Sequence, residues 1–157
     1  MCEYCGCQQI TVISELTREH DALVAMMAGI RGLLESGDLE SLAVACRQML
    51  QILGPHTTVE EQGLFVELDE QYPEHVAALS AEHRSIHAVL DRATTGVPTD
   101  PAWPRQVRDV LFLLREHILK EQDGVFPAAL ATLDADQWDR VQVVRARVGS
   151  PTHQGDT

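Results

Sequence analysis

The chain has 157 residues, enough for one domain with a single sizeable core. Its net charge of −12 argues against binding to nucleic acid or to anionic membranes, because both need a basic surface. Aromatic residues make up only 4% of the chain while Leu, Val and Ala are plentiful, which favours packed helices over sheets.

Apolar residues recur three and four apart along several long segments, which predicts amphipathic helices. The predicted segments are residues 10–35, residues 39–70, a third that starts at Pro73, a fourth with its stripe over Val107–Ala128, and a short last helix over residues 136–148. Asp38 suits the N-cap of the second segment, which also contains Pro55. We therefore expect an all-α protein, an up-down-up-down four-helix bundle over residues 10–148 with a short extra C-terminal helix. A disordered tail is expected at residues 149–157.

Residues 1–9 form a separate cysteine-containing tail in this interpretation. Cys2, Cys5 and Cys7 could form a disulfide or bind a soft metal ion, or they could belong to a reduced, mobile tail. Cys46 falls on an apolar stripe and is expected to be a small buried residue. The first residues do not resemble a signal peptide and no apolar run approaches the length of a membrane span, so we expect a cytoplasmic protein.

Histidine and glutamate interrupt the apolar stripes at positions that must face the core. These residues are His20, His56, Glu60, His83, His87, His117 and Glu121. A single inward histidine or glutamate is usually a hydrogen-bonded core residue. Seven of them on four stripes would include buried carboxylates that are energetically costly unless a cation neutralises them. The pattern therefore predicts a metal centre in the core.

An internal repeat supports this interpretation. The aligned segments are His56–Phe65 with His117–Phe126, offset by 61 residues without a gap, and Glu19-His20 with Glu82-His83, offset by 63. The chain thus reads as two helical hairpins, and they differ where His87 has Val24 as its counterpart. Phe65 and Phe126, one turn beyond each glutamate, are expected to seal the core from water.

The donor set indicates which metal binds. Five imidazoles and two carboxylates are too many for one tetrahedral zinc ion and too rich in nitrogen for calcium or magnesium. Two octahedral ions bridged by the two carboxylates would use every donor, and a mixed set of imidazoles and carboxylates suits iron.

The order and spacing of these histidines and glutamates resembles the hemerythrin-like (HHE cation-binding) family over about residues 10–133. The resemblance implies a cofactor of two iron ions (Fe2+/Fe3+) with an oxo or hydroxo bridge. It implies that one iron is held by His83, His87 and His117. The other would be held by His20 and His56, with Glu60 and Glu121 bridging the two.

The resemblance also implies a function. The expected partner is a small diatomic or peroxide ligand (O2, H2O2 or NO) rather than nucleic acid or membrane, bound by a monomer or weak homodimer. Val24 offers no third imidazole to the iron held by His20 and His56, so one coordination position there stays open. Three roles remain: peroxidase-, catalase- or NO-linked chemistry in stress response or sensing, reversible oxygen binding or storage, and iron storage or donation. We favour the first, because oxygen carriers place an aspartate where this chain has Gln122.

Overall fold

The computed structural model describes the backbone of residues 7–153 and the side chains of residues 11–152. Every regular element in this part of the chain is a helix, which confirms the expectation of an all-α protein. The α-helices are α1 (Cys7–Ser36), α2 (Leu39–Val59), α3 (Phe65–Leu68), α4 (Pro73–Leu90), α5 (Trp103–Lys120), α6 (Phe126–Thr132) and α7 (Ala135–Val148). Two π-helical turns, Glu60–Leu64 and Glu121–Val125, join α2 to α3 and α5 to α6.

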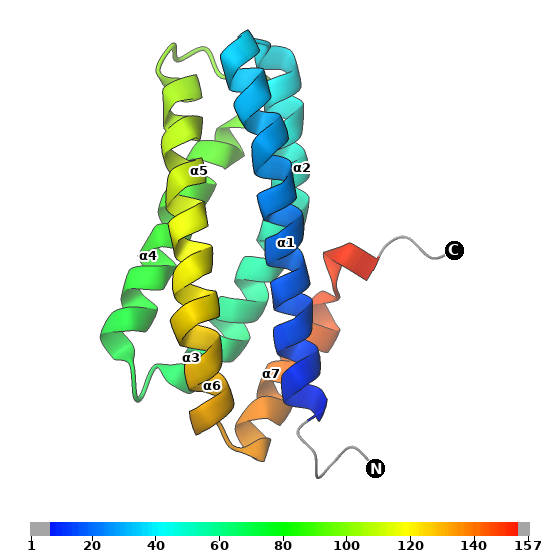
Figure 1. Cartoon of the computed structure of the whole chain (residues 1–157), viewed down its shortest axis with the longest axis vertical. Coiled ribbons are helices and arrows are strands. Elements are labelled where there is room, and N and C mark those ends of the chain that lie inside the picture. Colours follow the sequence, from blue (N-terminus) through cyan, green and yellow to red (C-terminus); the bar gives the residue numbers. More distant parts are fainter. Residues whose placement is uncertain (1–6, 154–157) are drawn as a thin grey trace.

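The long helices lie side by side along the long axis of the molecule (Figure 1). Helix α1 packs along α2, and α4 packs along α5. Because α3 continues α2 and α6 continues α5, the second half of each hairpin is one nearly unbroken rod interrupted only by its π turn. Helix α7 packs against α1, α2 and the first π turn.

Local sequence signals account for the helix ends. Asp38 caps α2 as expected, since its carboxylate accepts a hydrogen bond from the Ser41 backbone N–H at 3.1 Å. Gly37 ends α1 with a φ of 75°, a backbone conformation that favours glycine. At the start of α7, Asp134 and Gln137 form a reciprocal capping box.

The core consists of two apolar clusters. One contains Met27, Met49 and Trp103, and the other contains Phe126 and Trp138. On each long helix, one predicted metal-binding histidine stands in the sequence between residues of the two clusters: His20, His56, His83 and His117. The polar layer therefore lies between two apolar layers, where water has little access.

The chain ends differ in detail from the predicted boundaries. Helix α1 starts at Cys7, three residues before the expected position, and Pro151–His153 forms a short 3-10 turn. Cys2 and Cys5 lie outside the described residues. Cys46 is fully buried as expected, and burial raises the pKa of its thiol to about 11. Among the described residues, no helix combines the length and the apolar character needed to cross a membrane.

Candidate metal centre

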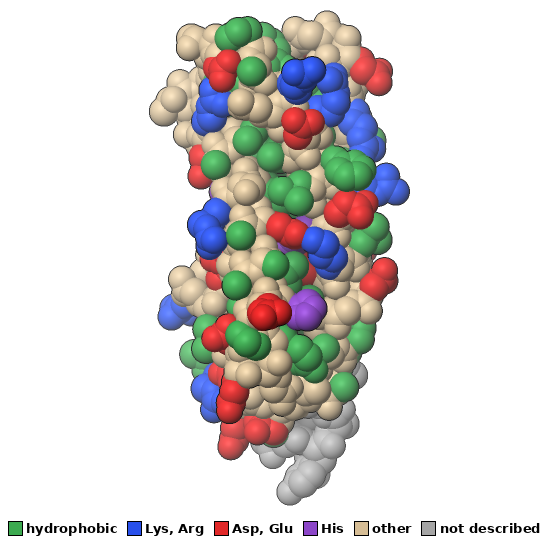
Figure 2. Space-filling model, turned by 90° about the vertical axis from the view of Figure 1, so that its left-hand side faces the viewer, with side chains coloured by type: hydrophobic (Ala, Val, Ile, Leu, Met, Phe, Trp, Pro, Cys, Tyr) green, Lys and Arg blue, Asp and Glu red, His purple; other side chains and the backbone are tan. Residues whose placement is uncertain are grey.

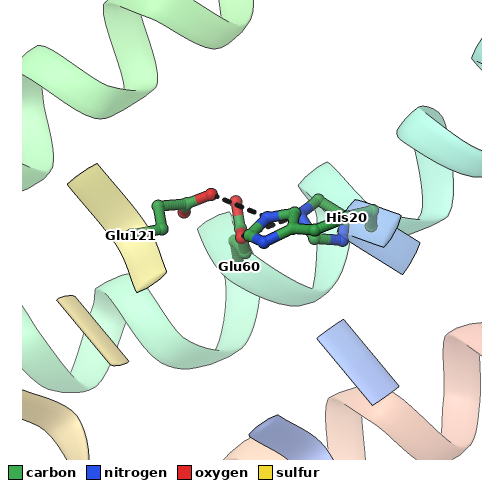
Figure 3. Close-up of side chains that lie close together, drawn as sticks. His20, Glu60 and Glu121 are labelled. Atoms are coloured by element: carbon green, nitrogen blue, oxygen red, sulfur yellow. Dashed lines mark hydrogen bonds and ion pairs between the residues drawn. The ribbon is translucent and has the colours of Figure 1, made fainter. Parts of the chain in front are cut away.

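The structure brings six of the seven predicted residues together in the middle of the core. They form two groups that share both glutamates: His20, His56, Glu60 and Glu121, and Glu60, His83, His117 and Glu121. All six side chains are buried, and within each group the potential ligand atoms lie within 4.8 Å of one another. In Figure 3, Glu60 and Glu121 reach from different helices toward His20.

The two glutamates connect the groups. Glu60 places Oε1 2.8 Å from His56 Nε2 and Oε2 3.1 Å from His83 Nε2, so its two oxygens face different groups. Glu121 Oε1 lies 3.1 Å from His20 Nε2 and 3.2 Å from His117 Nε2. Each carboxylate thus contacts one imidazole from each group, which is the geometry required of a bridging ligand.

His87 is the predicted residue that the structure leaves outside both groups. It is half-buried, and its Nε2 lies 3.1 Å from the Thr57 hydroxyl oxygen. Burial lowers the pKa of this imidazole. Without His87 the two groups have the same donor set, two imidazoles and two shared carboxylates, in place of the unequal three and two that the resemblance implied.

Three further carboxylates, which are not among the seven predicted residues, contact the outer nitrogens of the imidazoles. Nδ1 of His56 lies 3.1 Å from Glu19 Oε1, and Nδ1 of His83 lies 3.1 Å from Glu61 Oε1. Nδ1 of His117 lies 2.7 Å from a Glu82 oxygen. A carboxylate at Nδ1 keeps the proton on that nitrogen and leaves the Nε2 lone pair free for a metal ion.

The internal repeat contained a signal for two of these carboxylates. Glu19 precedes His20, and Glu82 precedes His83, in the aligned Glu-His pairs. Each of these glutamates pairs with the histidine on the next helix of its own hairpin, His56 or His117. The repeated pair therefore encodes a ligand together with the support for a second ligand.

Two phenylalanines cover the centre. The Phe126 ring stacks on His20 with centroids 5.4 Å apart, and Phe65 stacks on His83 at 5.7 Å. Both pairs are nearly parallel, with interplanar angles of 9° and 7°. Each phenylalanine lies over an imidazole of the other hairpin, and both are buried, as expected for residues that keep water out.

The charges of the centre are strongly coupled in the metal-free protein. Burial opposes the charged form of His56, but the negative charge of Glu60 and close contacts with Glu19 and Glu60 outweigh it and raise the pKa of His56 to about 10. Burial likewise opposes charge on His117, while contacts with Glu121, Glu60 and Glu82 raise its pKa to about 9. Burial favours a neutral Glu60, yet His56 and His83 hold the pKa of Glu60 well below its usual range.

Hydrogen bonding alone does not satisfy this cluster. Both oxygens of Glu60, one oxygen of Glu121 and Nε2 of His83 and His117 are buried without a hydrogen bond. Buried polar atoms are normally bonded, and these particular atoms converge on the two groups. A pair of cations would satisfy all of them, so the residues present fit a two-metal site.

The all-α fold and the two buried groups of histidines that share both glutamates define a helical protein with a candidate metal centre. Residues 11–129 match the model of the family described as the hemerythrin HHE cation binding domain, and the chain belongs to this family. Neither the curated proteins nor the solved structures gave a match. The match ends before α7, which begins at Ala135.

Proposed function

We propose that the chain is a cytoplasmic non-haem di-iron protein that binds or reacts with a small oxidant. Glu60 and Glu121 would bridge two irons, together with an oxo or hydroxo ion. The observation that most supports this proposal is the pair of histidine groups that share both carboxylates. Two imidazoles and two carboxylates do not fill the coordination sphere of an octahedral ion, so each iron keeps room for an external ligand.

The irons would supply redox chemistry and a coordination position for O2, H2O2 or NO. The residues of the chain orient and shield them. Glu19, Glu61 and Glu82 hold the outer nitrogens of three imidazoles, so that the inner nitrogens face the metal. Phe65 and Phe126 exclude water from one side of His83 and His20.

Within this class we propose a role in oxidative or nitrosative stress, with peroxide or NO chemistry rather than oxygen carriage. Gln122 stands where oxygen carriers place a bridging aspartate, and the bridging position falls to Glu121, which is one methylene longer. The added methylene changes how the bridge is held. We expect a catalase- or peroxidase-like turnover, or a reaction with NO, at this centre.

Metal analysis tests the first part of the proposal. Protein produced with ample iron should contain two irons per chain and show charge-transfer absorption in the near ultraviolet when oxidised. Glu60→Gln and Glu121→Gln should each lose most of both irons, because each carboxylate contacts both groups. Glu67→Gln, a change outside both groups that removes an ion pair with Arg140, is the matched control and should keep both irons. One zinc and no iron in the wild type would contradict the proposal.

Ligand reactions test the second part. The oxidised protein should consume added hydrogen peroxide, and the reduced protein should react with NO or oxidise within minutes in air. An oxygenated form that is stable in visible absorption and reverses on degassing, with no peroxide consumption, would favour the carrier role instead.

A further inference from the structure

Arg145 on α7 is a buried cation whose carboxylate partners lie on α1. Its side chain is 3% exposed, and Nη1 donates a hydrogen bond to Glu19 Oε1 at 3.0 Å. Nε lies 3.2 Å from Glu15 Oε2, and the guanidinium also donates to the Gly149 backbone carbonyl. A buried arginine needs such partners, because an unpaired charge in the core is strongly destabilising. The contacts fix both the arginine and the carboxylate that it holds.

Glu19 passes this contact on to the candidate metal centre. Its Oε1 accepts from Arg145 and also lies 3.1 Å from His56 Nδ1, while its Oε2 has no hydrogen bond. His56 in turn places Nε2 2.8 Å from Glu60 Oε1. A continuous line of side chains, Arg145–Glu19–His56–Glu60, therefore joins α7 to one of the two groups.

In the other hairpin, the corresponding glutamate pairs with a cation of its own hairpin. Glu82 is the counterpart of Glu19, and the cation beside it is Lys120, at the end of α5. The Lys120 side chain is 55% exposed, whereas that of Arg145 is buried. Figure 2 shows the face on the left-hand side of Figure 1, where acidic and basic side chains are scattered along the length of the molecule. The first group thus depends on a separate helix for its cation, and the second group does not.

Close packing holds α7 at this position. An added Cβ at Gly63, within the first π turn, would lie 3.5 Å from side-chain atoms of Val141 and Val144. The same addition at Gly124, its counterpart in the second π turn, would meet nothing within 4 Å. Helix α7 therefore rests on the π turn that begins at Glu60, and Arg145, the residue after Val144, points to Glu19.

We propose that Arg145 is a positioning residue of the metal centre. It fixes Glu19, which orients His56, and so strengthens binding of the ion that His20 and His56 hold. This rests on the proposed two-metal site. Without the guanidinium, the Glu19 carboxylate can rotate so that Oε1 no longer faces Nδ1 of His56. The His56 ring then loses the contact that orients it. Losing an outer partner of a metal-binding imidazole typically lowers metal affinity by about 10- to 100-fold. Only one of the two ions should be affected.

The test compares two arginines on the same helix. Arg145→Met removes the buried cation, and Arg140→Met removes a surface cation that pairs with Glu67. Metal-free proteins are titrated with cobalt(II) without oxygen, against a competing chelator, and the cobalt absorption reports each binding step. We expect Arg145→Met to weaken one step by at least about tenfold and leave the other unchanged. Arg140→Met should bind as the wild type does. Equal affinities of the two variants at both steps would overturn the proposal.

Two further variants separate positioning from a general loss of structure. Glu19→Gln should weaken the same step, and adding Arg145→Met to it should have little further effect, because the arginine acts through Glu19. Arg145→Lys should recover part of the loss. If Arg145→Met does not fold, Glu19→Gln alone decides, and unchanged binding at both steps overturns the proposal.

A measurement without metal gives an independent readout. In 15N-labelled metal-free protein, the Nδ1–H of His56 should show a protected NMR signal in the wild type and in Arg140→Met. In Arg145→Met this signal should broaden or disappear, and an unchanged signal would contradict the proposal. Failure of the wild type to bind two ions would overturn the proposed function itself, whereas two ions bound with equal affinity in all variants would overturn only the role of Arg145.

Discussion

The imidazoles of the centre differ in how their outer nitrogens are held. Those of His56, His83 and His117 each face a carboxylate, but Nδ1 of His20 is buried without a hydrogen bond. The repeat explains this, because the counterpart of Glu61, which holds His83, is Gln122. His20 is therefore held by ring stacking on Phe126 and by its contact with Glu121.

His87 provides a test of the ligand set at the level of one side chain. Since its Nε2 contacts the Thr57 hydroxyl and lies in neither group, His87→Ala should keep two metal ions per chain. His83→Ala, one turn earlier on α4, removes a member of one group and should lose at least one ion. Metal content by elemental analysis distinguishes the two variants. Loss of an ion from His87→Ala would show that this imidazole turns inward when metal binds.

The inward ligands could be predicted because histidine and glutamate on an apolar stripe conflict with their surroundings. Glu19, Glu61 and Glu82 gave no such conflict, since a charged residue beside the stripe is ordinarily a solvated one. The sequence placed His87 on the apolar stripe of its helix. Periodicity does not specify how far a side chain on that stripe reaches into the core. A side chain at the edge of the stripe can meet a neighbour such as Thr57 before it reaches the centre.

At the scale of whole elements, the two π turns are the feature that periodicity missed. Both start at a glutamate shared by the two groups and end just before a phenylalanine that covers the centre. A π turn holds one more residue than an α turn and often marks a functional site. Apolar residues three and four apart fit an α-helix whether or not one turn contains an extra residue. The sequence therefore predicted continuous helices through both π turns. The helix ends at Asp38 and Pro73 were predictable because they depend on local chemistry.

The two glycines of these turns give a matched pair of variants. Gly63→Leu should push against Val141 and Val144 and displace α7, lowering the free energy of unfolding by about 1–3 kcal/mol. Gly124→Leu extends into open space and should change it by less than about 1 kcal/mol. Urea unfolding of both metal-free variants measures the difference. Equal effects would show that α7 does not rest on the first π turn.

For the molecule as a whole, the centre is a layer of buried charged groups that must be neutralised by one another or by a pair of metal ions. The apolar clusters on either side stabilise the fold and offset the cost of burying this layer. Bound cations would add to it in proportion to their affinity, because metal that binds only the folded chain shifts unfolding by mass action. The metal-free protein, in contrast, must balance its carboxylates with protons on the imidazoles.

This balance predicts that the stability of the metal-free protein and its affinity for metal ions change in opposite directions with pH. In the metal-free protein the pKa values of His56 and His117 are raised to about 10 and about 9 from the ordinary 6.5. Protonation of these imidazoles therefore stabilises the fold fully below pH 6.5, and the benefit falls as pH rises through both values. The pKa of Glu60 is lowered from 4.5, so its contribution is present above that pH and is lost in acid.

The metal-free protein should accordingly be most stable near pH 5–6.5 and lose stability steadily toward pH 9. Metal ligation needs neutral imidazoles, so binding at neutral pH must displace these protons, and metal affinity should rise over the same range. Urea unfolding at pH 6 and pH 9, with and without two equivalents of cobalt(II), checks both trends. The midpoint should fall with pH for the metal-free protein, and the added stability from metal should grow. A metal-free midpoint that stays constant from pH 6 to pH 9 would contradict the raised pKa values of His56 and His117. An imidazole that binds its proton more tightly in the folded chain than in the unfolded chain must lower the stability of the fold when that proton is lost.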